Sequence, residues 1–336
     1  QKIMVIANMK SKDGIQGYNT ALLEIEKMIA LINDQRKLPV LEADKDVKFK
    51  CNVTKEEYCR MIEKTKHYIK EGDIFQGVIS RRFVADYKSS LINAYRVLRT
   101  TNPSPYMYFI QSDDLQIAGA SPETMVKLVD GKLTTFPVAG TRPRGKDRQE
   151  DLALEEDLFA DEKECAEHNM LVDLGRNDIG KISNYGTVEV EEYMQVLRYS
   201  HVMHIGSTVR GQIRDDKTAL DAVEAVLTAG TLSGAPKYRA MEIINELENN
   251  KRGIYGGAVG YLDFTGNLDT CIGIRLAYKK NGKVFVRSGA GIVADSIPEK
   301  EFQECINKAK AVVEAIKKTQ QMAVYEGKEN DDDTID

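Results

Sequence analysis

Two pairs of glutamates have the spacing most suggestive of chemistry in this sequence. Glu164 and Glu167 lie in DEKECAEH, and Glu301 and Glu304 lie in PEKEFQECINKAK. Residues three apart on a helix face the same side, so each pair would present two carboxylates together, and Lys308 continues the second face. Hard carboxylate oxygens together with waters suit Mg²⁺. The same spacing is also typical of a solvated helix surface, and spacing alone leaves both interpretations open.

Two glycine-rich segments are candidate anion sites. They are SGAGIVADS over 288–296 and AGTLSGAPK over 229–237, and the second leads into an expected helix. Glycines permit close approach of the backbone, and N–H groups at the start of a helix favour a carboxylate or phosphate. Neither segment fits the GxxxxGK[ST] loop or the GxGxxG fingerprint with its flanking elements, so nucleotide binding is not supported. Glycines that serve only turns and bulges remain the alternative.

Histidine is scarce, which narrows the choice of a proton-transfer group. The four histidines are His67, His168, His201 and His204. The last two fall in SHVMHIGSTVRG, whose alternation predicts a strand, so they should point to opposite faces and one should face a site. No Cys-His or Ser-His-Asp arrangement with a known spacing is present, which argues against amidotransferase or protease chemistry within this chain.

The elements that would position these residues are helices and hairpins in mixed order. Thr54 and Glu57 form a capping box that predicts a helix ending near Gly72. Asp130-Gly131 and Asn281-Gly282 are strong signals for two-residue hairpins. A buried strand is expected over 3–7. Further helices are expected over 18–32, about 149–173, about 218–227, 236 to about 248, and 298–318. The mixed order favours an α+β fold.

Composition excludes several classes of protein. The 336 residues carry Lys+Arg 47 and Asp+Glu 52, a formal net charge of -5, which offers no general attraction to nucleic acid or an anionic membrane. No apolar run approaches the roughly 18 residues of a membrane span. The 5 cysteines are scattered, which argues against a disulfide framework or a zinc site and favours a reducing cytoplasm. The start at Gln1 looks like a truncation.

A series of motifs then resembles, in order, those of the chorismate-utilizing enzymes, most closely the anthranilate synthase component I family. They are FQGVISRRF, NPSPYMYF, ASPE, FPVAGTRPRG, ADEKECAEHNMLVDLGRNDIGKI, HVMHIGS, AGTLSGAPKYRAMEI, YGGAVGY and RSGAGIVADSIPEKEF. The likeness covers roughly Thr54 to Lys318. It implies antiparallel β-sheets packed as a sandwich with surrounding helices, and a cleft for chorismate and Mg²⁺. The expected divisions are a remnant of an N-terminal region with a connector (1–53), a chorismate-binding catalytic domain (54–320) and an acidic, disordered tail (321–336).

The resemblance implies roles for individual residues. Glu167 and Glu304 match direct Mg²⁺ ligands, while Glu164 and Glu301 match partners through metal-bound water. The positions matching those that hold the substrate are Gly140, Thr141, Thr231, Tyr255, Arg275, Gly289, Gly291 and Lys308. This set is chemically suitable because the dianionic substrate needs cations and N–H donors, and arginine offers a carboxylate a two-pronged fork.

The implied reaction is addition of ammonia at C2 of chorismate with departure of the 4-hydroxyl, followed by elimination of pyruvate to give anthranilate. Glu123 matches the general acid, a role that requires it to keep its proton through burial or a nearby negative charge. His204 is the candidate for the elimination stage. His201 has no matched role.

Two further positions distinguish among relatives. At the catalytic position that Gln76 occupies in this chain, isochorismate and salicylate synthases carry a lysine, because attack by water needs a base. Aminodeoxychorismate synthase carries a nucleophilic lysine where this chain has Ala139. Because this chain has neither lysine, direct amination at C2 is favoured. Aminodeoxyisochorismate synthase shares both features and remains the alternative; aminodeoxychorismate synthase and a non-catalytic chorismate-fold binding protein also stay open.

Regulation and partners are likewise implied by resemblance. The motif Asn102, Pro103, Ser104, Pro105, Tyr106 and Met107 resembles half of a tryptophan feedback site. The other half in that family is an LLES-like motif in an N-terminal region that this sequence lacks. The implied partner is a glutamine amidotransferase subunit that supplies ammonia.

Overall fold

The computed structural model describes residues 2–34, 44, 46–199 and 202–328, and it divides the chain into two compact units, 1–41 and 42–336. The first unit holds a short 3₁₀ turn, η1 (Ser11–Asp13), and helix α1 (Gly14–Ile32). The helix expected over 18–32 is therefore confirmed. The strand expected over 3–7 is wrong, because these residues pair with no described strand, and an extended segment without a partner forms no sheet.

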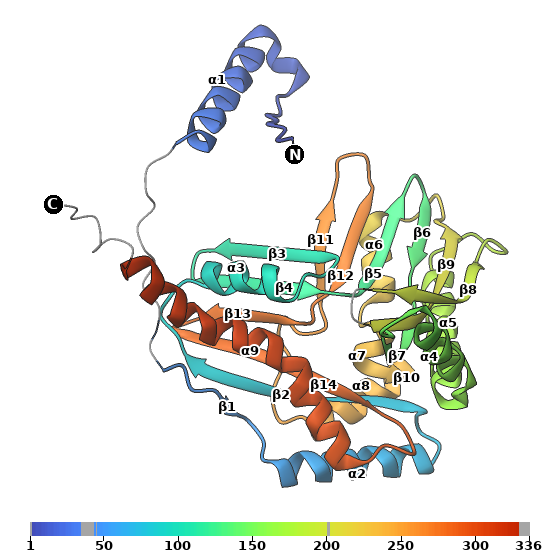
Figure 1. Cartoon of the computed structure of the whole chain (residues 1–336). Coiled ribbons are helices and arrows are strands. Elements are labelled where there is room, and N and C mark those ends of the chain that lie inside the picture. Colours follow the sequence, from blue (N-terminus) through green and yellow to red (C-terminus); the bar gives the residue numbers. More distant parts are fainter. Residues whose placement is uncertain (1, 35–43, 45, 200–201, 329–336) are drawn as a thin grey trace. The chain divides into compact units, whose positions relative to one another are not determined.

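Two antiparallel sheets form the body of the second unit (Figure 1). The first has the order β1-β2-β14-β13-β4-β3, with β10 also on β2. Its strands are β1 (Lys50–Cys51), β2 (Gln76–Asp86), β3 (Tyr106–Ser112), β4 (Leu115–Ser121), β10 (Gly234–Ala235), β13 (Leu276–Lys280) and β14 (Lys283–Ile292). Strand β1 pairs with β2, and the second unit begins at residue 42.

The second sheet has the order β11-β12-β5-β6-β9-β7, with β8 also on β9. Its strands are β5 (Thr124–Val129), β6 (Lys132–Thr135), β7 (Val138–Pro143), β8 (Glu189–Arg198), β9 (Val202–Gln212), β11 (Ala258–Leu262) and β12 (Leu268–Ile272). The two predicted hairpins are confirmed as β5–β6 and β13–β14. Asp130, Gly131, Asn281 and Gly282 all have positive φ, as a type I′ turn requires.

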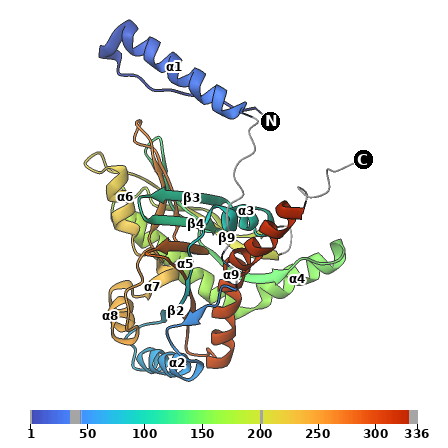
Figure 2. The ribbon, with the colours of Figure 1, turned by 90° about the vertical axis from the view of Figure 1, so that its left-hand side faces the viewer.

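Helices surround the sheets, which confirms the expected α+β organisation. They are α2 (Lys55–Lys70), α3 (Ile92–Thr101), α4 (Arg148–Ala160), α5 (Glu162–Gly180), α6 (Ala219–Val226), α7 (Gly230–Ser233), α8 (Lys237–Leu247) and α9 (Pro298–Lys328). Figure 2 shows α9 beside α3, where Val312 and Ile316 share a buried core with Leu98. No helix among these described segments is long and apolar enough to cross a membrane.

Local chemistry sets the ends of the helices that matter for the site. Thr54 and Glu57 form the predicted capping box of α2. The helix expected over 149–173 is instead two helices, because Asp161 has an extended backbone and its carboxylate accepts the N–H groups of Lys163 and Glu164. Asp161 therefore ends α4 and caps the start of a separate helix, α5.

The last helix is longer than expected. Helix α9 runs to Lys328, so the tail expected from residue 321 is helical over 321–328. The segment TQQMAVYEGK contains good helix formers and no proline, which lets the helix continue. The rest of that tail lies outside the described residues.

Candidate active site

Glu164 lies in the first turn of α5 and Glu301 in the first turn of α9, and Glu167 and Glu304 follow one turn later. Asp161 caps α5 immediately before Glu164 and Glu167, and Pro298 starts α9 immediately before Glu301 and Glu304. Each pair therefore lies near the start of a helix, as the spacing predicted, and the backbone dipole favours the negative charge of Glu164 and Glu301 in the first turns.

Shared lysines show that the two pairs face a common space. Burial raises the pKa of Glu167, Glu164 adds to the rise, and the charges of Lys163 and Lys308 oppose it. Burial likewise raises the pKa of Glu301, and the same two lysines oppose that rise. The same two lysines therefore act on a carboxylate of each helix, which indicates that the two pairs lie near one another. The structure thus brings together four carboxylates that are far apart in the sequence.

Lys308 holds one of these carboxylates directly. Its Nζ lies 2.5 Å from Oε1 of Glu304 and donates to the carbonyl of Gly289 at 3.3 Å. Within the described part of the chain, no three His, Cys, Asp or Glu side chains come close enough together to hold a metal ion. The carboxylates therefore converge on one region but do not form a closed ligand cage.

Gln76 lies beside the carboxylate pair of α5. It starts β2, and its Nε2 donates to Oε1 of Glu167 at 3.4 Å. A side chain at Gly291 would place its Cβ 2.6 Å from the same Nε2, so glycine leaves the amide its space. The side-chain oxygen of Gln76 is buried and accepts no hydrogen bond from the described residues, so it is an available acceptor.

Glu123 lies between β4 and β5 and contacts a second predicted residue. Thr231 Oγ1 donates to Glu123 Oε1 at 2.9 Å. Burial raises the pKa of Glu123, and the Thr231 hydrogen bond and two nearby cations, Lys308 and Arg275, only partly offset the rise. A carboxyl whose pKa is raised by burial retains its proton to higher pH, which is the condition set for a general acid.

Arg275 lies near this acid and near one carboxylate of α9, Glu304. The guanidinium interacts electrostatically with Glu123, with Glu304 and with the hydroxyl of Tyr255. Burial lowers the pKa of Arg275, and these acidic neighbours oppose the decrease. Tyr255 is 7% exposed, and its hydroxyl lies 3.1 Å from where a Cβ would stand on Gly289. Arg275, Tyr255 and Gly289 therefore line the same region as Glu123.

His204 approaches the site from β9. Its Nδ1 lies 2.7 Å from the carbonyl of Gly140 and 3.1 Å from Oγ1 of Thr141. Donation to the carbonyl places the proton on Nδ1 and leaves Nε2 as an acceptor. Gly140 has φ 66, and a Cβ there would lie 2.9 Å from Leu158 and 3.5 Å from Oε2 of Glu164. His204 is therefore linked through Gly140 to the carboxylates of α5, whereas His201 lies outside the described residues.

The motif expected to bind tryptophan joins α3 to β3. Asn102 caps the end of α3, and Ser104 Oγ donates back to its carbonyl at 3.4 Å. The hydroxyl of Tyr106 donates to Asp269 at 2.8 Å and lies 2.8 Å from Oγ1 of Thr124. Since Thr124 follows Glu123, this motif is connected to the acid by one hydrogen bond and one peptide bond.

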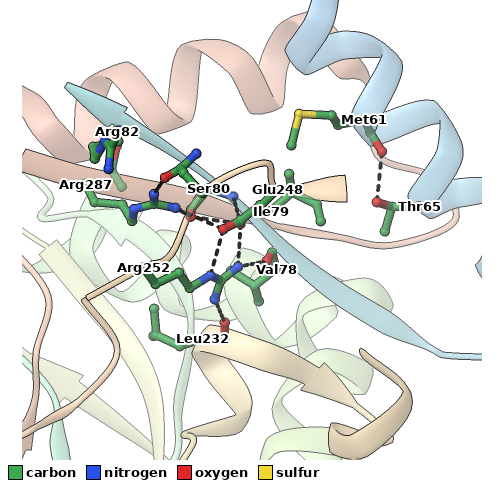
Figure 3. A network of polar contacts seen from close by, with 12 residues as sticks. Met61, Thr65, Val78, Ile79, Ser80, Arg82, Leu232, Glu248, Arg252 and Arg287 are labelled. Carbon is green, nitrogen blue, oxygen red and sulfur yellow. Dashed lines mark hydrogen bonds and ion pairs between the residues drawn. The ribbon is translucent and has the colours of Figure 1, made fainter. Parts of the chain in front are cut away.

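A buried ionic network near the site was not predicted from the sequence (Figure 3). Glu248 follows α8 and is 8% exposed, and its carboxylate accepts hydrogen bonds from Ser80, Arg252 and Arg287. An arginine in the middle of an apolar strand, as in KVFVRSGAGI, was the available signal. His168 is buried, and its Nε2 lies 2.6 Å from Oγ of Ser207.

Comparison with known proteins adds independent information. The chorismate binding enzyme family matches residues 3–314. The chain is 51% identical over 324 residues to anthranilate synthase component 1 of Acetivibrio thermocellus, covering 94% of this chain and 66% of that protein. It is 50% identical over 325 residues to the same component of Aquifex aeolicus, covering 94% and 65%. The chain thus spans slightly less than two thirds of the length of these relatives.

Solved structures agree with this assignment. Anthranilate synthase component I from Streptococcus pneumoniae superposes with TM-score 0.80 at 45% identity, covering 88% of this chain and 66% of that chain. The menaquinone-specific isochorismate synthase from Escherichia coli gives TM-score 0.72 at 24% identity over 88% of this chain and 69% of its own, which shows a shared fold. With the family match over most of its length, this chain belongs to the chorismate binding enzyme family.

Proposed function

We propose that this chain is the chorismate-converting component of an anthranilate synthase. It would aminate chorismate at C2 with ammonia and eliminate pyruvate, giving anthranilate. The relatives at about half identity bear that name. The observation that carries the choice of reaction is Gln76 beside Glu167, since an amide cannot serve as the base that attack by water on chorismate would need.

Magnesium is part of this proposal, which is supported by the carboxylate oxygens of the two glutamate pairs. Glu167 and Glu304 would hold the ion directly, with Glu164 and Glu301 acting through its waters, because Mg²⁺ prefers oxygen ligands and retains water. The pKa values of Glu167 and Glu301 are raised by burial and by their neighbouring carboxylates, a repulsion that a divalent cation would relieve. Bound Mg²⁺ would supply positive charge to the ring carboxylate of the substrate.

The remaining residues have distinct tasks in this scheme. Arg275 and Tyr255 would bind a substrate carboxylate, since they lie together near Glu123. Glu123 would give its proton to the departing 4-hydroxyl, with Thr231 fixing the orientation of its carboxyl group. His204 would then accept the C2 proton at Nε2, as the ring becomes aromatic and the bond to the enolpyruvyl oxygen breaks.

The proposal also includes a partner and a regulator. The name component 1 implies a second component, and a glutamine amidotransferase subunit would supply the ammonia. The motif over 102–107 would contribute to a tryptophan site, and its hydrogen bond through Tyr106 to Thr124 supports communication with Glu123.

Product analysis tests the proposal. Purified protein is incubated with chorismate, Mg²⁺ and an ammonium salt, and the products are separated and identified by mass and fluorescence. Anthranilate is expected as the main product. Isochorismate, 4-amino-4-deoxychorismate or an accumulated aminated, non-aromatic product would refute it in favour of a relative. The matched control is Glu123→Gln, which should fold but lose on the order of 10²-fold or more in rate.

A further inference from the structure

The buried carboxylate of Glu248 is surrounded by donors from three separate segments (Figure 3). Its Oε1 accepts the N–H of Ser80 at 2.8 Å, the hydroxyl of Ser80 at 2.9 Å and Nη2 of Arg252 at 2.6 Å. Its Oε2 accepts Nε of Arg252 at 3.0 Å and Nη1 of Arg287 at 2.9 Å. One side chain at the end of α8 thus binds β2, β14 and the loop after α8.

Arg252 also donates to the backbone of α7 and of β2. Its Nη1 donates to the carbonyl of Leu232 at 2.5 Å, and its Nη2 also donates to the carbonyl of Val78 at 2.6 Å. Leu232 belongs to α7 and Val78 to β2. The guanidinium therefore fixes α7 against β2, while Glu248 fixes the guanidinium itself.

Arg287 closes the network from β14. Its Nη1 also donates to the hydroxyl of Ser80 at 2.8 Å, and its Nη2 donates to Asn250 and, at 3.4 Å, to the carbonyl of Lys251. Arg287 is 5% exposed, so its charge depends on Glu248 for compensation.

Three of the anchored residues, Leu232, Val78 and Ser80, lie next to residues of the candidate active site. Leu232 follows Thr231, whose hydroxyl donates a hydrogen bond to Glu123. Val78 pairs with Gly291 in the sheet, and Ser80 pairs with Gly289. These neighbours all belong to the predicted substrate-binding set, whereas Glu248, Arg252 and Arg287 do not.

The same network reaches the tyrosine of the site. The centre of the Arg252 guanidinium lies 5.8 Å from the centroid of the Tyr255 ring. Glu248, Arg252, Leu232 and Tyr255 also line a cavity of about 520 Å³. Water from this cavity can enter the space left by a shortened Arg252 side chain, so a variant at this position is expected to fold.

We propose that Arg252, held by Glu248 and Arg287, is a positioning residue that sets Thr231 and Tyr255 in register with Gly289 and Gly291 for binding of the substrate carboxylates. This inference rests on the proposed function. It assigns Arg252 no contact with substrate. Its effect passes through α7, β2 and the loop that carries Tyr255.

The test measures kinetics and local backbone protection on Arg252→Ala and Arg252→Lys. The control is Arg239→Ala, which removes an arginine from α8 that binds Asp73 at 3.2 Å on a more exposed surface. For Arg252→Ala we expect the KM for chorismate to rise on the order of tenfold to a hundredfold, while the KM for ammonia changes less than about twofold. Arg252→Lys keeps the charge but not the fork, so its KM should fall between wild type and alanine.

A purely structural role would give a different pattern. It would lower the active fraction, and therefore the apparent kcat, without moving the KM for chorismate, and that result would overturn the proposal. Amide hydrogen exchange provides a readout that needs no turnover. In Arg252→Ala, exchange should accelerate over 230–235 and 76–80 but not in the β5–β6 hairpin. Equal protection of these segments in Arg252→Ala and Arg239→Ala would also overturn the proposal. If wild-type protein fails to convert chorismate, the proposed function fails, and the exchange experiment still decides whether Arg252 holds these segments.

Discussion

Replacing Glu248 by glutamine should destabilise the protein strongly, because it removes the counter-charge of two arginines. The side chains of Glu248 and Arg287 are each 3% exposed. Glutamine keeps the shape but has no charge, and one of its two positions becomes an N–H donor that faces other donors. Removing one partner of a buried ion pair costs about 3–5 kcal/mol, since the remaining charge stays buried without compensation.

Urea unfolding at 25 °C measures this cost. With a slope of about 1–3 kcal/mol per molar, a loss of that size moves the midpoint by about 1 M or more. The matched control is Glu242→Gln within α8, where Glu242 accepts from Arg239 at 3.0 Å and the two side chains are 47% and 38% exposed. That exposed pair should contribute only about 0–1 kcal/mol.

A companion double variant sharpens the comparison. Adding Arg287→Met to Glu248→Gln removes the charge of Arg287, which the single variant leaves without its counter-charge. The combined loss of unfolding free energy should therefore be smaller than the sum of the two single losses. The reasoning is refuted if Glu248→Gln shifts the midpoint no further than Glu242→Gln does.

Three further outcomes follow from the site and its surroundings. Glu304→Gln should weaken Mg²⁺-dependent binding of chorismate in calorimetric titrations, and unchanged binding would count against the proposed metal site. His204→Ala should slow pyruvate release more than amination, so rapid-quench samples should contain an aminated, non-aromatic intermediate; equal slowing of both steps would assign His204 another role. Arg144 and the N–H of Gly145 lower the pKa of Asp151 to about 2. Because the folded-state pKa lies below the unfolded value of 3.8, this carboxylate stabilises the protein above pH 3.8 and loses that effect as pH falls towards 2. The difference in urea midpoint between wild type and Asp151→Asn should therefore shrink over that window, and a constant difference would contradict the assignment.

Local features of the fold could be predicted because local chemistry determines them. The capping box at Thr54 and the Asp130-Gly131 turn depend only on residues a few positions apart. The division between α4 and α5 was missed because the apolar pattern continues across Asp161, although an aspartate three residues before Glu164 is itself a cap signal. The strand expected over 3–7 failed because strand formation depends on a partner that periodicity does not reveal.

The site itself could be predicted only in part. Spacing placed Glu164 with Glu167 on one face and Glu301 with Glu304 on another, but no periodicity brings α5 and α9 together. The resemblance to a family supplied that relation. For the Glu248 network the sequence offered only an arginine within an apolar strand and no indication of its partner. The members come from the end of α8, a loop and two strands, and the tertiary fold sets which buried charges pair.

The central claim is that this chain performs amination and elimination at one site, and isotope tracing tests it most directly. The protein is supplied with chorismate, Mg²⁺ and ¹⁵N-ammonium, and anthranilate and pyruvate are quantified by mass spectrometry over the time course. We predict anthranilate carrying a single ¹⁵N, with one pyruvate formed for each anthranilate. Pyruvate without labelled anthranilate, or labelled product without pyruvate, would contradict the account.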